Sequence, residues 1–228
     1  MLMGMLSDDS ASERSLIISM SEVIAREGSE LARGMNFRDS GGPLSVLLSL
    51  PRDGEYTDTW DAARGLFIYE GHDSIAEGAR GREDDQLLMY ASGKPPENGT
   101  FYKAAHAYKD GQKDGMRELP LQVQVYEKLD PGVFFDKGIF NLADATFASD
   151  GRRKVVKLYL SPADAADPEA SWSERMIDLA MKAEVWKQTG GRCATCAREE
   201  GLHFMLGARE VALLCTLHKS RTPGDATI

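Results

Sequence analysis

Basic residues, cysteines and long hydrophobic runs are all scarce in this chain of 228 residues. Lysine and arginine total 27 against 36 aspartate and glutamate residues, and the net charge of −9 argues against a protein that coats nucleic acid indiscriminately. No apolar run approaches the roughly 20 residues that a membrane-spanning helix needs. The stretch 1–6 is apolar but lacks a basic region and a long apolar segment, so we expect no secretory signal. A cytoplasmic protein with no membrane partner is therefore expected.

The hydrophobic content of 42% is enough for a folded core, which predicts one medium domain plus a small appendage. The acidity is uneven, since residues 1–70 carry 6 basic and 12 acidic side chains and residues 71–160 carry 13 and 14. A local basic groove is compatible with this distribution and would give a modest salt dependence. Solvated surface charge is the alternative interpretation of these cations. The clustered cations are Arg80, Arg82, Lys103, Lys109, Lys113, Arg152, Arg153, Lys154 and Lys157.

The N-terminal third predicts a helix followed by a strand. Ser10-x-x-Glu13 is a capping-box pattern, and the apolar residues after it fall on one helical face. We expect one amphipathic helix over about 11–32, with Gly28 as a stop. The apolar run 44–50 is confined to strand length by a proline and glycines on its two sides.

The middle of the chain predicts loops, a helix and strands in turn. Residues 85–91 suit a short helix, 94–99 a turn cluster, 100–108 a helix or strand edge, and 111–117 a basic loop.

Period-two alternation then predicts three strands, over 121–128, 138–147 and 153–160. A further helix is expected to open at Asp167-Pro168 and to end at Gly190-Gly191.

All three cysteines lie in the last 36 residues, as Cys193-x-x-Cys196 and Cys215-x-x-His218. Two such pairs separated by about eighteen residues direct four ligands at one tetrahedral ion. Three thiolates and one imidazole favour zinc, which would stabilise a tail too short for a core of its own. A redox CxxC motif or chance are the alternatives, although a thioredoxin-like unit is not indicated.

The block 66–160 carries landmarks in a recognisable order. Tyr69-Glu70-Gly71-His72-Asp73 follows a strand-like run, and Asp85-Gln86 and Asn98-Gly99 come next. Two strands then flank a turn and contain Phe135-Asp136-Lys137-Gly138-Ile139-Phe140. This order resembles the SRA (YDG) domain of bacterial SRA-HNH modification-dependent restriction enzymes, over roughly residues 40–160. The family's Tyr-Asp-Gly-hydrophobic-Tyr signature stands here with one inserted residue and with Phe for both Tyr.

The resemblance implies an α+β fold with an SRA-like (PUA-like) twisted β-barrel flanked by helices. A small C-terminal zinc-stapled HNH-like module is expected beside it. The implied divisions are an N-terminal helix (1–35), the SRA-like domain (36–162), a connecting helix (163–190) and the zinc-binding HNH-like remnant (191–228).

The family flips a modified cytosine out of the duplex and holds it between two Tyr, with an Asp on its edge. Tyr69 stands at the second stacking position. The segment 55–61 resembles the part that supplies the first aromatic ring and the carboxylate. The candidates there are Tyr56 or Trp60 for the ring and Asp58 or Asp61 for the carboxylate, with strand-end packing as the alternative for both rings. Asp73 would brace the loop or meet the flipped nucleotide.

The family also grips DNA with two loops, which here would be 72–84 and 109–118. Arginine and lysine in these loops would contact phosphates or fill the vacated space. Turn chemistry alone would also explain Asn98-Gly99. The candidate DNA-binding residues are Arg80, Arg82, Asn98, Lys109, Lys113, Arg117, Arg152 and Arg153.

The tail resembles the HNH nuclease module only at its edges, 186–193 and 211–215. Such nucleases need an acidic or imidazole neighbour beside the strand histidine, and a downstream Asn. Here the strand 201–206 has His203 alone, and the following loop is short. The module is therefore interpreted as degenerate. His203 is the only catalytic candidate, and a surface or packing histidine is the preferred interpretation.

These patterns favour a bacterial, nucleoid-associated reader of duplex DNA that contains 5-methylcytosine or 5-hydroxymethylcytosine. The alternative is a modification-dependent HNH endonuclease that uses His203 with Mg²⁺ or Mn²⁺. A third possibility is a zinc-stabilised protein that meets a protein partner through its acidic N-terminal third. A homodimer, or a separate nuclease as partner, stays open.

Overall fold

The computed structural model describes residues 16–28, 31, 34–38, 44–50, 58–73, 83–115, 119–163, 174–175, 177–206, 211–215 and 217–218. The strands are β1 (Ile17–Ser19), β2 (Met35–Asn36), β3 (Ser45–Ser49), β4 (Thr59–Asp61), β5 (Leu66–Glu70), β6 (Gln122–Asp130), β7 (Val133–Ser149), β8 (Lys154–Pro162), β9 (Leu202–Leu206) and β10 (Val211–Cys215). The helices are α1 (Met20–Glu27), α2 (Glu97–Lys113) and α4 (Leu179–Thr189). None of the described helices is long and apolar enough to cross a membrane.

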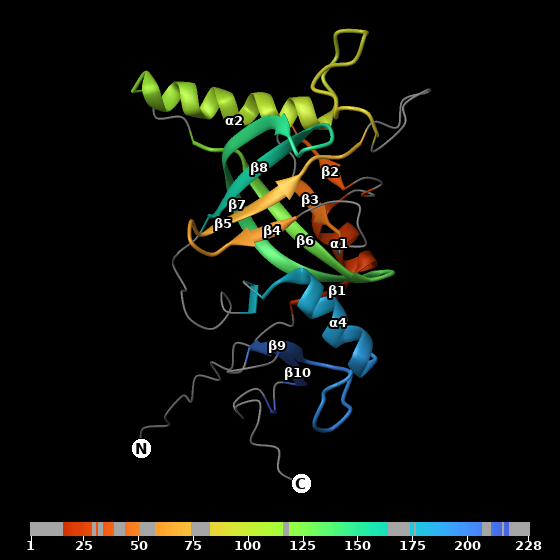
Figure 1. Ribbon diagram of the computed structural model, residues 1–228. Coiled ribbons are helices and arrows are strands. Elements are labelled where there is room, and N and C mark those ends of the chain that lie inside the picture. Colours follow the sequence, from red (N-terminus) through yellow and green to blue (C-terminus); the bar gives the residue numbers. More distant parts are fainter. Residues whose placement is uncertain are drawn as a thin grey trace, which may run out of the picture.

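A curved mixed sheet of eight strands forms the centre of the molecule (Figure 1). Its order is β2-β3-β6-β7-β8-β5-β4, with β1 added beside β7. Strands β3 and β6 run parallel, and the other pairs are antiparallel. The three predicted central strands are confirmed as β6, β7 and β8, and the expected mixture of sheet and helices is confirmed. The expected barrel does not close through its backbone, because no pairing joins β2 to β4 among the described residues.

The predicted N-terminal helix is wrong at its beginning. Ile17 and Ile18 form β1 and pair with Phe135 and Phe134 on β7, which suits β-branched residues. Helix α1 begins only after Ser19, whose side chain and backbone form a capping box with Glu22, while the predicted box at 10–13 lies outside the described residues. The stop predicted at Gly28 is confirmed, with a left-handed conformation at φ 69°, so the helix does not extend to residue 32.

Helix α2 corrects two further predictions. Residues 85–91 are not helical, and the backbone N–H of Gln86 instead donates to the carbonyl of Lys154 on β8. The helix begins at Glu97, inside the predicted turn cluster, and continues to Lys113, inside the predicted basic loop. Gly99 lies so close to the preceding loop that a Cβ there would be 2.0 Å from the carbonyl oxygen of Leu88. The helix lies across one end of the sheet (Figure 1) and buries its apolar side in the main core.

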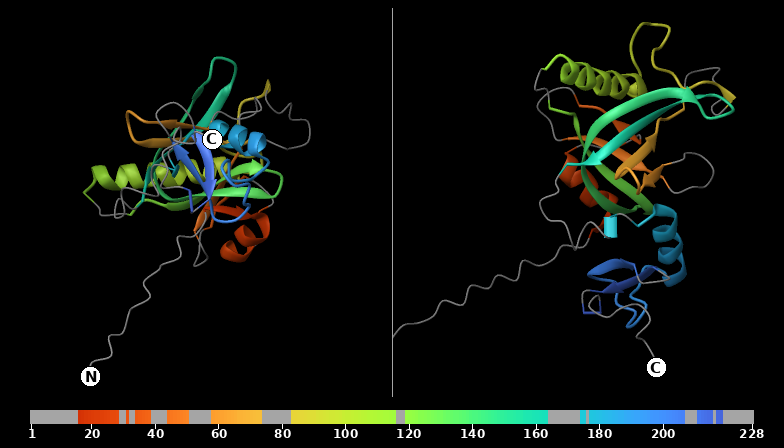
Figure 2. Two further views of the ribbon diagram at one scale, coloured as in Figure 1. Left: turned by 90° about the horizontal axis from the view of Figure 1, so that it is seen from below. Right: turned by 60° about the vertical axis from the view of Figure 1, so that its left-hand side comes forward.

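The C-terminal unit, which consists of α4, β9 and β10, lies below the sheet (Figure 2). Helix α4 begins after Asp178, whose side chain accepts from the backbone N–H of Ala180, and it ends at Gly190 as predicted. The predicted opening at 167–168 lies outside the described residues, but the single helix predicted from there to Gly190 is wrong, because residues 177 and 178 are not helical. The core of the C-terminal unit is completed by the β6–β7 hairpin. The ring of Phe135 on β7 meets that of Phe204 on β9 edge to face, with their centres 6.0 Å apart.

A β-bulge on β7 connects this unit to the sheet. Val125 pairs with Gly138 and Tyr126 with Asp136, so Lys137 is the extra residue of the bulge. Its ammonium group lies 2.6 Å from one carboxylate oxygen of Glu127, and Lys182 of α4 lies 2.5 Å from the other. All three side chains are buried. Burial lowers the pKa of Lys182 to about 8 although Glu127 opposes the shift.

This buried ion group yields a test of how the unit is attached. Glu127→Gln would leave two buried ammonium groups without a carboxylate, and we expect a loss of about 3–5 kcal/mol in the free energy of unfolding. Lys182→Met keeps the side-chain length and leaves Glu127 paired with Lys137, so we expect a smaller loss. Urea unfolding of both variants measures the difference, and equal losses would contradict this account.

Candidate functional site

Strands β3 and β5 are not paired through their backbones, and side chains bridge them instead. The hydroxyl of Tyr69 on β5 lies 3.2 Å from the carbonyl oxygens of Leu48 and Gly34. It also lies 2.7 Å from Nε2 of His72, whose pKa is lowered by burial. Tyr69 is 1% exposed, so its ring is part of the core in this state.

Asp58 forms the second bridge. It directly precedes β4, and the pairing of Thr59 with Ile68 sets it beside Tyr69. One carboxylate oxygen accepts the Ser49 hydroxyl at 2.6 Å, and the other accepts the backbone N–H of Glu70 at 2.8 Å. Burial raises the pKa of Asp58 to about 7, although both hydrogen bonds act to lower it. We call the junction of Leu48, Ser49, Asp58 and Tyr69 the seam.

The other aromatic and acidic candidates lie elsewhere or outside the described residues. Asp61 lies at the far end of the β4–β5 hairpin, where its side chain accepts the backbone N–H of Arg64 at 3.1 Å. Trp60 is half-buried and packs against the main core. Tyr56 falls among the residues that are not described. Asp58, rather than Asp61, is therefore the carboxylate that the fold brings to Tyr69.

Residues 70–73, which we call the exit segment of β5, include the candidate Asp73 and are contacted by two further candidates, Arg153 and Asn98. Arg153 lies 2.5 Å from Asp73 and 3.9 Å from Glu70. Asn98 accepts from the backbone N–H of His72 and donates to its carbonyl oxygen, at 3.0 and 2.7 Å. Arg153 is only 7% exposed, so the expectation that it lines a DNA groove is not met.

Sequence reasoning did not assign the partners that complete this arrangement. Gln86 is 1% exposed, accepts the backbone N–H of Val156 at 2.8 Å and donates to the carbonyl of Gly71 at 2.5 Å. Ser49 holds Asp58 from β3. A signal was present for Gln86, since Asp85-Gln86 is one of the ordered landmarks of the block 66–160.

The remaining cationic candidates differ in their surroundings. Lys109 forms an ion pair with Asp144 at 2.8 Å, and the exposed Lys113 pairs with Asp110 one turn away at 2.8 Å. Arg152 is exposed on the β7–β8 turn. The candidates Arg80, Arg82 and Arg117 lie outside the described residues.

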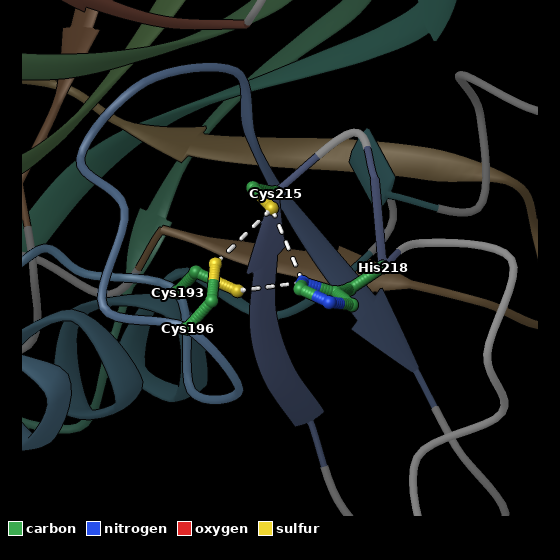
Figure 3. Close-up of side chains that lie close together, drawn as sticks. All are labelled: Cys193, Cys196, Cys215 and His218. Carbon is green, nitrogen blue, oxygen red and sulfur yellow. Dashed lines mark hydrogen bonds between the residues drawn. The ribbon is translucent and has the colours of Figure 1, made fainter.

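The four predicted metal ligands come together in the C-terminal unit (Figure 3). Their ligand atoms all lie within 4.8 Å of one another. The thiols of Cys196 and Cys215 are 3.7 Å apart, and Nδ1 of His218 lies 3.3 Å from Cys215 and 3.6 Å from Cys193. Four ligands at tetrahedral zinc bond lengths of about 2.0–2.3 Å are separated by about 3.5 Å, so the group fits a metal ion. Burial opposes ionisation of Cys193, but backbone N–H groups lower the pKa of its thiol to about 6.

His203 has an acidic neighbour that its own strand did not reveal. Its Nδ1 lies 3.4 Å from the carboxylate of Glu174, which also accepts the backbone N–H of Phe204 at 2.7 Å. The histidine is 3% exposed, and it lies on β9 opposite Leu214. The acidic neighbour absent from the strand is thus supplied from another part of the chain, and the burial of His203 agrees with a packing histidine rather than a surface one.

No family model matches the chain, and no curated protein matches it. Several solved structures resemble it at low identity. The SRA domain of SUVH5 with hemimethylated CG DNA shares 16% identity over 68% of this chain and 90% of that chain, with a TM-score of 0.44. KRYPTONITE with mCHG DNA and SAH shares 17% over 68% and 32%, with a TM-score of 0.43. The DNA modification-dependent restriction endonuclease AspBHI shares 17% over 70% and 39%, with a TM-score of 0.41.

The raised pKa of Asp58 predicts a pH-dependent stability. Because the folded-state pKa, about 7, lies above the ordinary value of 3.8, the carboxyl group stabilises the fold when protonated. That contribution is complete below the unfolded-state pKa and is lost as the pH rises through about 7. Urea unfolding between about pH 5 and pH 8 should show the wild type losing stability relative to Asp58→Asn as the pH rises. A constant difference between the two proteins would show that Asp58 does not titrate in this range.

Proposed function

We propose that this chain is an SRA-like reader that binds duplex DNA containing 5-methylcytosine or 5-hydroxymethylcytosine and takes the flipped base at the seam. The observation that carries the proposal is the position of a buried carboxyl group, Asp58, beside Tyr69 where two strands meet without backbone pairing. The SUVH5 and KRYPTONITE structures hold methylated or hydroxymethylated DNA, which is the same class of ligand.

The seam offers the groups that a flipped cytosine needs. The exocyclic amino group of cytosine is a donor, and the carboxylate of Asp58 has lone pairs beyond those that accept from Ser49 and Glu70. The carbonyl oxygen of Leu48 is a further acceptor nearby. The ring of Tyr69 would stack on the base. Since this ring is 1% exposed, entry of a base requires the surrounding segments to move apart at the seam.

The C-terminal unit is proposed to hold a structural zinc ion in a remnant of an HNH-like module. Cys193, Cys196, Cys215 and His218 would supply all four tetrahedral positions, which leaves none for a catalytic water. The metal would connect the loop after α4, which contains Cys193 and Cys196, to the end of β10, where Cys215 lies and which His218 follows. The burial of His203, which is 3% exposed, argues against the endonuclease alternative, although Glu174 supplies an acidic neighbour.

The reader hypothesis is tested by the affinity ratio for otherwise identical duplexes with 5-methylcytosine and cytosine. The wild type should prefer the modified duplex, and Asp58→Ala should lose about 1–3 kcal/mol of binding to it, because the amino group loses its acceptor. Tyr69→Leu should lose stacking worth on the order of 1–3 kcal/mol. Tyr69→Phe keeps the ring and loses only the hydroxyl contacts with Gly34, Leu48 and His72, so it should lose less of the preference.

Melting temperatures must accompany these measurements, because Tyr69 is a core residue. Equal wild-type affinities for the two duplexes, or a folded Tyr69→Leu protein with the wild-type ratio, would refute this binding mode. The same duplexes incubated with Mg²⁺ test the alternative, since specific nicking that disappears in His203→Ala would establish the endonuclease.

Elemental analysis tests the metal site. We expect one zinc ion per chain in the purified protein and in Thr195→Ala, which alters an exposed residue between two ligands. Cys215→Ser should lose the ion and lower the stability of the C-terminal unit, because its core contains Cys193 and Cys215. Metal-free wild-type protein, or a disulfide between Cys193 and Cys196, would contradict the assignment.

A further inference from the structure

Two adjacent arginines on the β7–β8 turn have opposite surroundings. Asp150 accepts the backbone N–H groups of both Arg152 and Arg153, at 2.8 and 3.0 Å, and Gly151 takes a left-handed conformation at φ 100°. This turn leaves the side chain of Arg152 in solvent and directs that of Arg153 inward, where it is 7% exposed. Only Arg152 is therefore open to a phosphate group.

The guanidinium group of Arg153 joins the β7–β8 turn to two other parts of the chain. It pairs with Asp73 at 2.5 Å, lies 3.9 Å from Glu70, and donates to the carbonyl oxygen of Asp84 at 3.2 Å. Two of these partners belong to the exit segment, and the third belongs to the loop before Gln86. Ion pairs in a buried environment are costly to break, so the guanidinium group holds these backbones in one arrangement.

The exit segment is enclosed on its other sides as well. Asn98 binds both backbone groups of His72, and Gln86 donates to the carbonyl of Gly71. A Cβ on Gly71 would lie 2.6 Å from Oδ1 of Asn98 and 2.9 Å from Oε1 of Gln86. The segment therefore has little room to shift while these contacts are intact.

The position of this segment determines the geometry of the seam. Its first residue, Glu70, donates its backbone N–H to Asp58, and His72 contacts the hydroxyl of Tyr69. A displacement of the segment would move Asp58, the proposed acceptor for the base, and would release the Tyr69 hydroxyl from His72. The two groups proposed to meet the base therefore both depend on the exit segment, whose two ends, Glu70 and Asp73, Arg153 contacts.

We propose that Arg153 is a positioning residue for recognition of the modified base and does not contact DNA phosphates. The proposal rests on the proposed reader function, and it gives neighbouring arginines separate tasks. Arg153 fixes the exit segment, and through it Asp58 and Tyr69, whereas Arg152 is free to contribute to sequence-independent DNA contacts.

The test compares Arg153→Gln with its matched neighbour Arg152→Gln, using duplexes with 5-methylcytosine and cytosine over a series of salt concentrations. Arg153→Gln should lower the affinity ratio about tenfold, as expected for loss of a charged hydrogen-bonding partner, and leave the salt dependence unchanged. Arg152→Gln should weaken both duplexes alike and reduce the salt slope by about one. Arg153→Lys keeps a positive charge near Asp73 but loses the second hydrogen-bonding group of the guanidinium. Its affinity ratio should therefore lie between those of Arg153→Gln and the wild type.

The outcomes separate this inference from the function on which it rests. A wild type without preference for the modified duplex would refute the reader function itself. A wild type with preference, together with an Arg153→Gln protein that keeps the ratio or weakens both duplexes equally, would overturn the positioning role alone. If Arg153→Gln does not fold, Arg153→Lys decides, because a folded protein with the full wild-type ratio would also overturn it.

Discussion

One buried carboxylate, Glu127, is the interaction on which the arrangement of the sheet and the C-terminal unit depends. Its two cationic partners come from a bulge on β7 and from α4, and no solvent reaches the three charges. Charged groups in such surroundings are stable only while each has a partner. The bulge at Lys137, the docking of α4 and the shared apolar core beneath them are therefore mutually required. Phe135 contributes to the apolar core through its contact with Phe204, and to the ion group because its ring centre lies 3.7 Å from the ammonium group of Lys182.

The seam shows a different way of joining strands. Backbone pairing closes a sheet continuously, but here Tyr69 and Asp58 reach from β5 and the start of β4 to β3 through side chains. Side-chain hydrogen bonds can be exchanged for bonds to a ligand one at a time, whereas breaking a paired strand exposes many backbone groups. A site that must admit a base is thus better placed at such a junction than within the paired sheet. The ordered exit segment beside it would limit how far the junction opens.

Local sequence patterns predicted the elements whose structure depends on local interactions. The three central strands followed from alternation, and the clustering of Cys193, Cys196, Cys215 and His218 from their spacing. The first strand was missed because Ile17 is extended only through its pairing with a strand more than a hundred residues later. Arg152 and Arg153 are equivalent in sequence, and only the turn before them separates an exposed cation from a buried one. The insertion of Lys137 was visible, but the carboxylate it shares with Lys182 required the folded chain.

The charged groups around Glu127 and Glu70 also affect the pKa of Asp58. Glu127 and Glu70 both raise the pKa of Asp58 through their negative charge, in addition to the larger effect of burial. Two lysines lie around Glu127, and Arg153 lies beside Glu70. These cations partly neutralise the two glutamates and so limit how far the pKa of Asp58 is raised. In the proposed binding mode, a base donates a hydrogen bond to Asp58 and favours its ionised form. The ion group that attaches the C-terminal unit and the arginine that holds the exit segment thus set the electrostatic conditions under which Asp58 would accept that bond.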